Sequence, residues 1–154
     1  MPDRDRTGWH TTEIEAGLRR LTGLTPTSGY PEEVRLQALI AAFHATATRA
    51  ADTDWTGIVR AYRRLEALTG SPVVRLNRAV AEGEAHGPMA GLAVLRAVGE
   101  RLPGHHRVAL VRAELLRRDG RFEDAAEAYR SALATAPDGP ERRQIEARLR
   151  DLPG

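Results

Sequence analysis

The 154-residue sequence contains no cysteine. Disulfide bonds, thiolate zinc sites and a cysteine nucleophile are therefore excluded, and the composition is compatible with the cytoplasm, where we expect the protein to act. No apolar stretch approaches the roughly 18 residues that a membrane span needs, and the first residues are polar, so we expect neither export nor membrane insertion.

Lysine is also absent, and all 23 basic residues are arginines. They are balanced by 21 acidic residues to a net charge of +2, with the two signs interspersed along the chain. Only two Trp, two Phe and three Tyr are present. Nucleic-acid binding requires clustered positive charge and aromatic side chains for base stacking, so direct binding of nucleic acid is not expected.

A repeat is the strongest positive signal in the sequence. Three residues recur at spacings of 34 and 33 positions, and a second set follows them at seven, six and seven positions. The first set is Trp55, Met89 and Phe122, and the second is Tyr62, Leu95 and Tyr129. A period of this length is typical of helical hairpins, which bury their apolar faces by stacking on one another.

Apolar periodicity and helix-stop residues predict an all-α fold, with helices at residues 12–21, 31–48, 54–69, 72–85, 89–102, 105–118, 122–135 and 140–152. We expect one tetratricopeptide-like domain over residues 1–154, a superhelical stack of three hairpins at residues 31–69, 72–102 and 105–137. An extra helix stands at each end, at residues 11–22 and 140–152, and residues 1–10 are expected to be flexible. Asp52 or Thr53 is predicted to cap the third helix.

The last hairpin carries the sharpest motif. Gly120, Ala125, Tyr129, Ala132 and Pro137 fall at the offsets of the second helix of a tetratricopeptide repeat. Small residues allow two helices to approach closely, and proline ends a helix, so Tyr129 is predicted to fill the space between repeats. An altered copy lies 34 residues upstream, at Gly91, Leu95, Val98 and Pro103.

Five runs carry a family resemblance. They are LQALIAAFHA at residues 36–45, DTDW at 52–55, SPVVRLNRAVA at 71–81, GPMAGL at 87–92 and RAELLRRDGR at 112–121. Together they resemble the C-terminal tetratricopeptide-like extension of bacterial extracytoplasmic-function sigma factors, of the sigma-70 family, from about residue 5 to residue 152.

The resemblance implies a domain that regulates or supports a sigma factor. Its expected partners are proteins, namely sigma regions, RNA polymerase or a regulator, and its oligomeric state is not indicated. The promoter-reading and polymerase-binding regions that precede the extension in such sigma factors are not found in this sequence. We therefore expect either an excised extension or a stand-alone relative that does not recognise a promoter by itself.

Polar residues within the predicted helices provide the candidate binding site. His44 and Asn77 stand 33 residues apart, Arg78 adjoins Asn77, and Arg112 follows about one repeat later. If these four side chains line the concave groove of the stack, they would suit an acidic segment or a peptide carboxylate, because guanidinium groups bind carboxylates bidentately. The alternative is that His44 and Asn77 are buried and bonded to backbone or to Trp55.

No catalytic residue, metal ligand or cofactor is assigned. His105 and His106 are expected to point about 100° apart on one helix, which places them poorly as paired ligands. No nucleotide-binding or hydrolase motif is present, and capping explains Asp52 and Asp54. The function expected is protein interaction in transcription control; the alternative is a small-molecule-sensing or enzymatic domain that uses the same groove.

Overall fold

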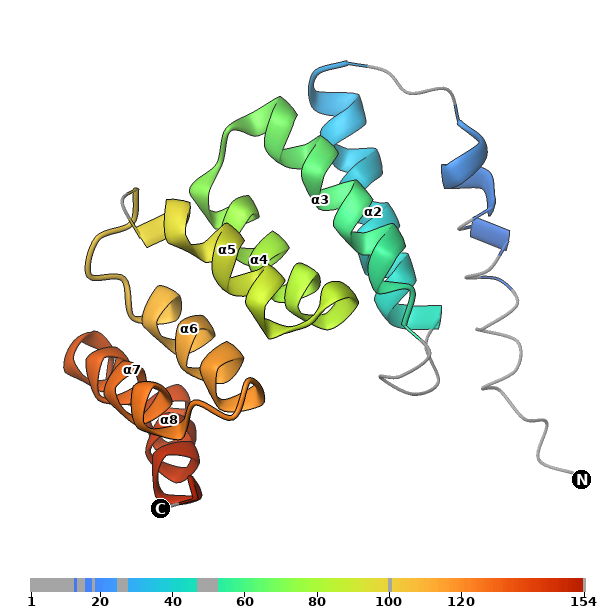
Figure 1. The fold of residues 1–154 in the computed structure, drawn as a ribbon. Helices are drawn as coiled ribbons and strands as arrows, with labels where there is room; N and C mark the ends of the chain where they lie inside the picture. Colours follow the sequence, from blue (N-terminus) through green and yellow to red (C-terminus); the bar gives the residue numbers. More distant parts are fainter. Residues whose placement is uncertain are drawn as a thin grey trace, which may run out of the picture. The chain divides into compact units, whose positions relative to one another are not determined.

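The computed structural model describes residues 13, 16–17, 19–24, 28–46, 53–99 and 101–153. Over these ranges the chain forms helices paired as hairpins, and no described residue lies in a strand, which confirms the predicted all-α helical-repeat class (Figure 1). The chain divides into two compact units, Met1–Gly70 and Ser71–Gly154. The single continuous stack over residues 1–154 stays a prediction, and each unit is described by itself.

The first unit contains the hairpin of α2 (Tyr30–Thr46) and α3 (Trp55–Thr69). Of the expected N-terminal helix, residues 13, 16–17 and 19–23 are helical, whereas residues 1–10 lie outside the described part of the chain. The hairpin core consists of apolar side chains at helical spacing on both helices: Leu36, Leu39, Ile40, Phe43, Ile58, Val59, Ala61 and Leu65.

The predicted cap of α3 is wrong. Asp54, rather than Asp52 or Thr53, is the capping residue, because its carboxylate oxygen Oδ1 accepts a hydrogen bond from the Gly57 amide at 2.8 Å. An N-cap side chain bonds the backbone amide two or three residues further on, which is the position of Gly57 relative to Asp54. The bond satisfies one of the amides in the first turn that have no partner within the helix.

The second unit consists of five helices within the described residues: α4 (Pro72–His86), α5 (Pro88–Gly99), α6 (His106–Arg118), α7 (Phe122–Thr135) and α8 (Pro140–Arg150). α4 packs on α5 and α6 on α7, as the hairpin prediction requires. α6 also packs on α4 and α5, and α8 packs on α7. Figure 1 shows these helices side by side in chain order, which places α6 between the α5 and α7 layers.

The sequence repeat marks the second helix of each hairpin. Trp55 and Phe122 are the first residues of α3 and α7, and Met89 is the second residue of α5. Tyr129 and Leu95, which follow at six or seven positions, are 0% and 4% exposed. The period therefore reports where each second helix begins, and in α5 and α7 it also marks a core side chain, whereas Tyr62 of α3 is half-buried.

Two predicted helix ends are too late. α5 ends at Gly99 rather than residue 102, and α8 ends at Arg150 rather than residue 152. Leu102 and Leu152 each precede a proline, whose ring disfavours the helical conformation of the residue before it. From α2 onward the other described starts and ends agree with prediction to within one residue. The N-terminal helix ends at residue 23, two residues later than the predicted residue 21.

Two apolar clusters hold the second unit together. One joins Leu76 and Ala79 of α4 with Leu95 and Val98 of α5 and Leu115 of α6. The other lies among α6, α7 and α8, and consists of Ala113, Leu116, Ala125, Ala128, Tyr129, Ala132, Ala136 and Ile145. No described helix is both long enough and apolar enough to cross a bilayer.

Candidate binding groove

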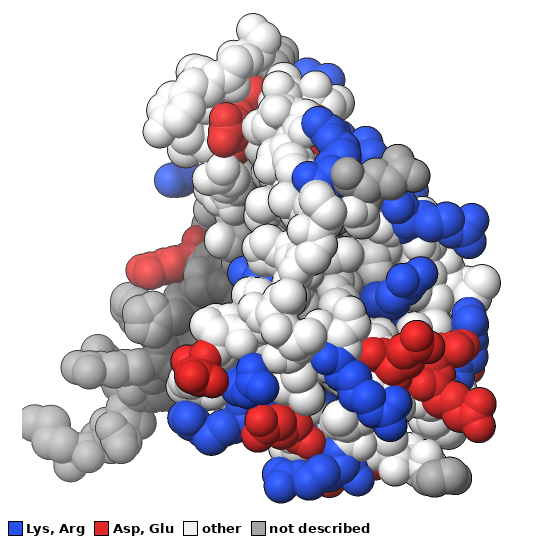
Figure 2. All heavy atoms as spheres, turned by 90° about the vertical axis from the view of Figure 1, so that its left-hand side faces the viewer, with Lys and Arg blue, Asp and Glu red and all other residues white. Residues whose placement is uncertain are grey.

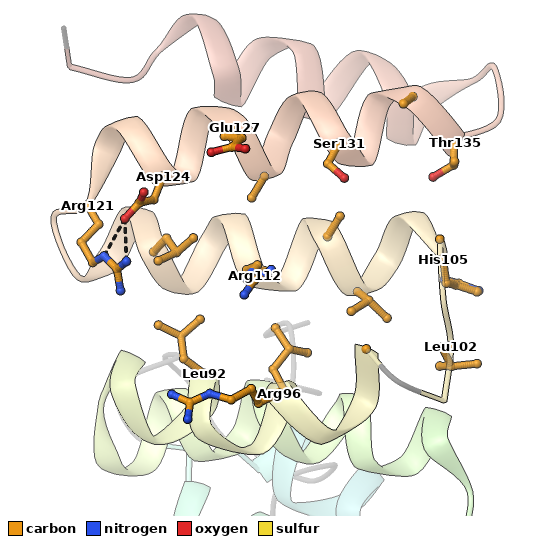
Figure 3. A pocket seen from close by; sticks show the side chains of 18 of the residues that line it. Leu92, Arg96, Leu102, His105, Arg112, Arg121, Asp124, Glu127, Ser131 and Thr135 are labelled. Atoms are coloured by element: carbon orange, nitrogen blue, oxygen red, sulfur yellow. Dashed lines mark hydrogen bonds and ion pairs between the residues drawn. The ribbon is translucent and has the colours of Figure 1, made fainter.

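Helices α5, α6 and α7 of the second unit line a groove of about 790 Å³ (Figure 3). Its surface is partly aliphatic, with side chains from all three helices and the α5–α6 connection: Met89, Leu92, Leu95, Leu102, Val108, Ala109, Leu116, Ala128 and Ala134. Most polar lining residues are solvent-exposed, so the groove is an open channel rather than an enclosed cavity.

Three arginines from three consecutive elements lie along the groove. Arg96 is on α5, Arg112 on α6, and Arg121 immediately precedes α7. Figure 3 shows the Arg96 side chain along α5 and the Arg112 side chain on α6, the next helix, with Leu92 close to Arg96. Among the described residues, neither Arg96 nor Arg112 has an ion pair or side-chain hydrogen bond.

The turn before α7 positions Arg121. Gly120 adopts φ +77°, a conformation that glycine reaches without steric cost, and the chain reverses there between α6 and α7. Arg121 then pairs with Asp124 in the first turn of α7, with Nε–Oδ2 and Nη2–Oδ2 distances of 2.8 and 2.6 Å. The Arg121–Asp124 pair leaves Arg96 and Arg112 as the unneutralised cations of the groove.

The α7 wall has a different character. Glu127, Ser131 and Thr135 occupy its groove-facing side, and Glu127 has no ion pair among the described residues (Figure 3). The groove is therefore polarised, with two uncompensated guanidinium groups from α5 and α6 and one uncompensated carboxylate from α7. Guanidinium groups bind carboxylates and phosphates through paired hydrogen bonds, whereas the carboxylate repels anions close to α7.

Of the four predicted site residues, the structure places Arg112 in this groove and Asn77 and Arg78 outside its lining. Asn77 is exposed on α4. His44 is exposed on α2, in the other unit, and its ring meets the edge of Trp55 at a centroid distance of 5.4 Å and an interplanar angle of 77°. The alternative that His44 and Asn77 are buried is thus wrong, although the contact with Trp55 is present.

Arg78 forms an ion pair within α4 and does not line the groove. Its Nη1 lies 3.5 Å from Oε1 of Glu82, one turn further along α4, and the Glu82 side chain is only 5% exposed. His86 Nδ1 lies 2.8 Å from the other carboxylate oxygen. A buried carboxylate requires partners, and Arg78 and the His86 ring nitrogen are among those of Glu82.

Sequence reasoning missed Arg96 and Arg121. The sequence does show that Arg96 shares a helix face with Leu92, because the two residues stand four positions apart on α5. Val108, Arg112 and Leu116 share a face of α6 in the same way. These two faces could be found from the sequence, but their meeting in one groove with Arg121 depends on how α5, α6 and α7 pack.

The two adjacent histidines lie differently from expectation. Their rings stack, with centroids 5.1 Å apart and an interplanar angle of 13°. The helical rule of about 100° per residue does not apply, because His105 is the N-cap of α6 with an extended backbone and only His106 is helical. His106 Nε2 lies 3.2 Å from Glu141 Oε2 on α8. No group of three or more possible metal ligands occurs among the described residues.

Behind the groove, Tyr129 and Glu114 join the last three helices. The Tyr129 hydroxyl donates to Glu114 Oε1 at 2.6 Å, Arg117 Nη2 lies 3.1 Å from Oε2, and Arg148 of α8 lies 3.7 Å from Oε1. Burial, and then the hydrogen bond to Glu114, raise the pKa of Tyr129 well above its ordinary value. The neutral phenol is the form that this core accommodates.

Comparison with known proteins assigns no family. No family model matches the chain, and no solved structure matches it. An uncharacterized protein of Rhizobium meliloti (strain 1021) is 38% identical over 152 residues, which cover 99% of this chain. The chain spans only 36% of that relative's length, so the similar segment belongs to a considerably longer protein.

Proposed function

We propose that the chain is a protein-interaction and regulatory domain of an extracytoplasmic-function sigma factor, which modulates transcription initiation by contacting sigma regions, RNA polymerase or a regulator. The five sequence runs that resemble the C-terminal extension of such sigma factors support this assignment. The relative of Rhizobium meliloti is consistent with it, because a regulatory extension is one part of a longer protein.

The open, polarised groove is the observation that carries the proposal. Helical repeats commonly present extended binding surfaces, and a peptide requires an open channel, whereas a small molecule is usually held in a more enclosed pocket. The groove joins aliphatic side chains to unpaired arginines, which is a combination that recognises a segment of another protein.

Charge reversal in the groove tests the proposal in the source organism. The native gene is replaced by one that encodes Arg112→Glu, and the matched control encodes Arg143→Glu, which reverses an exposed arginine of α8 outside the groove. We expect Arg112→Glu to change transcription from a limited set of promoters, at unchanged protein level, while the control resembles the parent. Identical transcript profiles for all three strains would contradict the proposal.

A further inference from the structure

The unpaired state of Arg96 and Arg112 contrasts with their surroundings. Arg117 and Arg118, further along α6, pair with Glu114 and Glu84 respectively. Partner carboxylates are therefore available to neighbouring arginines of this unit, yet none lies within ion-pairing distance of the two groove arginines among the described residues. These two guanidinium groups keep their full capacity for paired hydrogen bonds to an external carboxylate.

Apolar and cationic groups alternate along the same surface. Leu92 precedes Arg96 by one turn of α5, and Val108 and Leu116 flank Arg112 by one turn on either side. A ligand that satisfies this surface must offer aliphatic side chains and carboxylates at comparable intervals. Amphipathic peptide segments have that pattern, whereas a uniformly charged polymer does not.

Nucleic acid fits the groove poorly. Among the described residues no Trp, Tyr or Phe lines it, and His105 is the one aromatic ring there, so successive bases would lack a series of stacking platforms. Glu127 on the α7 wall, which has no ion pair among the described residues, would repel a phosphate backbone there. In the lower part of the face drawn in Figure 2, arginine and acidic side chains are interspersed rather than gathered into a basic stripe of the kind that follows a nucleic-acid strand.

We infer that the groove binds an acidic amphipathic segment of a partner protein, which sets aliphatic side chains against α5 and α6 and carboxylates beside Arg96 and Arg112. This inference rests on the proposed function and adds the chemistry of the partner. α6 has 13 residues, and its length of about 20 Å matches about 13 helical residues or six extended ones. A segment of about twelve residues is therefore sufficient to test either conformation.

Selection from a random library of twelve-residue peptides tests the inference with the full chain. The targets are the parent and the double variant Arg96→Glu/Arg112→Glu, both checked for helicity and cooperative melting. The parent is expected to select peptides that combine Asp or Glu with Leu, Ile or Val, and the double variant to select Lys or Arg in place of the acids. Selection of the same peptides by both targets, or of no consensus by the parent, overturns the inference.

Single substitutions keep the test decisive if the double variant does not fold. A selected peptide should bind Arg112→Ala about tenfold or more weakly than the parent, because one charge-assisted contact is lost. Arg143→Ala removes the same charge from α8 outside the groove and should bind like the parent. Equal affinities of folded Arg112→Ala and parent overturn the inference.

An oligothymidylate strand is the competing probe. It should bind at least tenfold more weakly than the selected peptide; tighter binding that depends on Arg96 and Arg112 would replace the acidic peptide with a nucleic acid. Failure of the peptide consensus alongside an Arg112-dependent transcript profile would reject the partner chemistry and keep the proposed function. Loss of the transcript effect with a clear acidic consensus would reject the sigma-factor role and keep the groove chemistry.

Discussion

At the residue scale, the buried Tyr129 depends on a hydrogen bond to the charged Glu114. Tyr129 is 0% exposed, and its hydroxyl donates a hydrogen bond to the carboxylate of Glu114. The same carboxylate forms ion pairs with Arg117 and Arg148. An aromatic ring fills the space between α6 and α7, and the polar tip requires a partner because it is desolvated. Glu114 supplies that partner while remaining compensated by arginines.

Removing the Tyr129 ring should destabilise the fold. We expect Tyr129→Ala to lower the free energy of unfolding by about 3 to 5 kcal/mol, through the lost apolar burial and the cavity that remains. Denaturant unfolding followed by circular dichroism measures the change. A melting temperature within about a degree of the parent would contradict the central packing role of this side chain.

The pKa of Tyr129 predicts how stability depends on pH. The ordinary value is 10.0 and the folded value is raised, so above about pH 10 the unfolded chain releases a proton that the folded protein retains. Stability is therefore full below that pH and falls as pH rises. We expect the fall between about pH 9 and pH 11 to be smaller in Tyr129→Phe, which has no phenol to ionise. Equal losses in parent and variant would be incompatible with this linkage.

Arg78 should contribute more than Arg112 to the stability of the fold. Arg78→Ala leaves the buried Glu82 carboxylate without the guanidinium 3.5 Å away, and we expect it to lower the free energy of unfolding. The expected loss is about 1 to 3 kcal/mol. Arg112→Ala, at an exposed position, should change stability by less than about 0.5 kcal/mol. Comparable unfolding free energies for the two variants would show that the Glu82 pair is not stabilising.

The sequence predicts packing residues better than binding residues. The offset of Tyr129 in the repeat correctly places it in the core, because core positions follow the helical period. The pairing of Arg78 was also readable, since Glu82 stands four residues further along the same helix. The groove depends on how α5, α6 and α7 pack, which no local spacing encodes, so only Arg112 of its three arginines was predicted.

At the scale of the helices, glycine allows α4 and α5 to approach each other closely. A Cβ atom placed on Gly91 would lie 2.6 Å from the Ala79 carbonyl oxygen of α4 and 2.9 Å from Leu115 Cδ2 of α6. Backbone atoms cannot move away without shifting a helix. Gly91 stands 34 residues before Ala125, so it occupies the small-residue position of the repeat.

We expect Gly91→Ala to destabilise the second unit by about 1 to 3 kcal/mol, because overpacking outweighs the higher helix propensity of alanine. Gly99→Ala is the control, since a Cβ there meets nothing within 4 Å. Thermal unfolding of both variants measures the difference. If Gly91→Ala is as stable as Gly99→Ala, the close approach of α4 and α5 does not constrain the fold.

Helix boundaries could be predicted where a side chain or ring sets them directly. Ser71 caps α4 through its hydroxyl and Pro72 occupies the first turn, as expected from their types. The ends of α5 and α8 were predicted too late, because apolar periodicity continues to Leu102 and Leu152 while the following prolines already prevent helix there. Local steric rules should therefore take precedence over periodicity at helix ends.

At the scale of the whole molecule, the repeat predicts the hairpins but does not predict that the chain divides into two compact units. The two compact units meet in sequence at Gly70, where the left-handed conformation of φ +61° ends α3. The groove with its three arginines belongs entirely to the second unit. The binding proposal therefore stands on one unit and requires no arrangement between the two.

Covalent capture from inside the groove tests the central claim most directly. Ser131, which is exposed on the groove side of α7, is replaced by the photoreactive residue p-benzoylphenylalanine, with the same replacement of Arg143 on α8 as control. After irradiation of living cells, we predict that position 131 becomes linked to a sigma region, RNA polymerase or a regulator of either, through a segment that combines acidic and aliphatic residues. The account is contradicted if positions 131 and 143 give the same products, or if position 131 yields no protein linked to transcription.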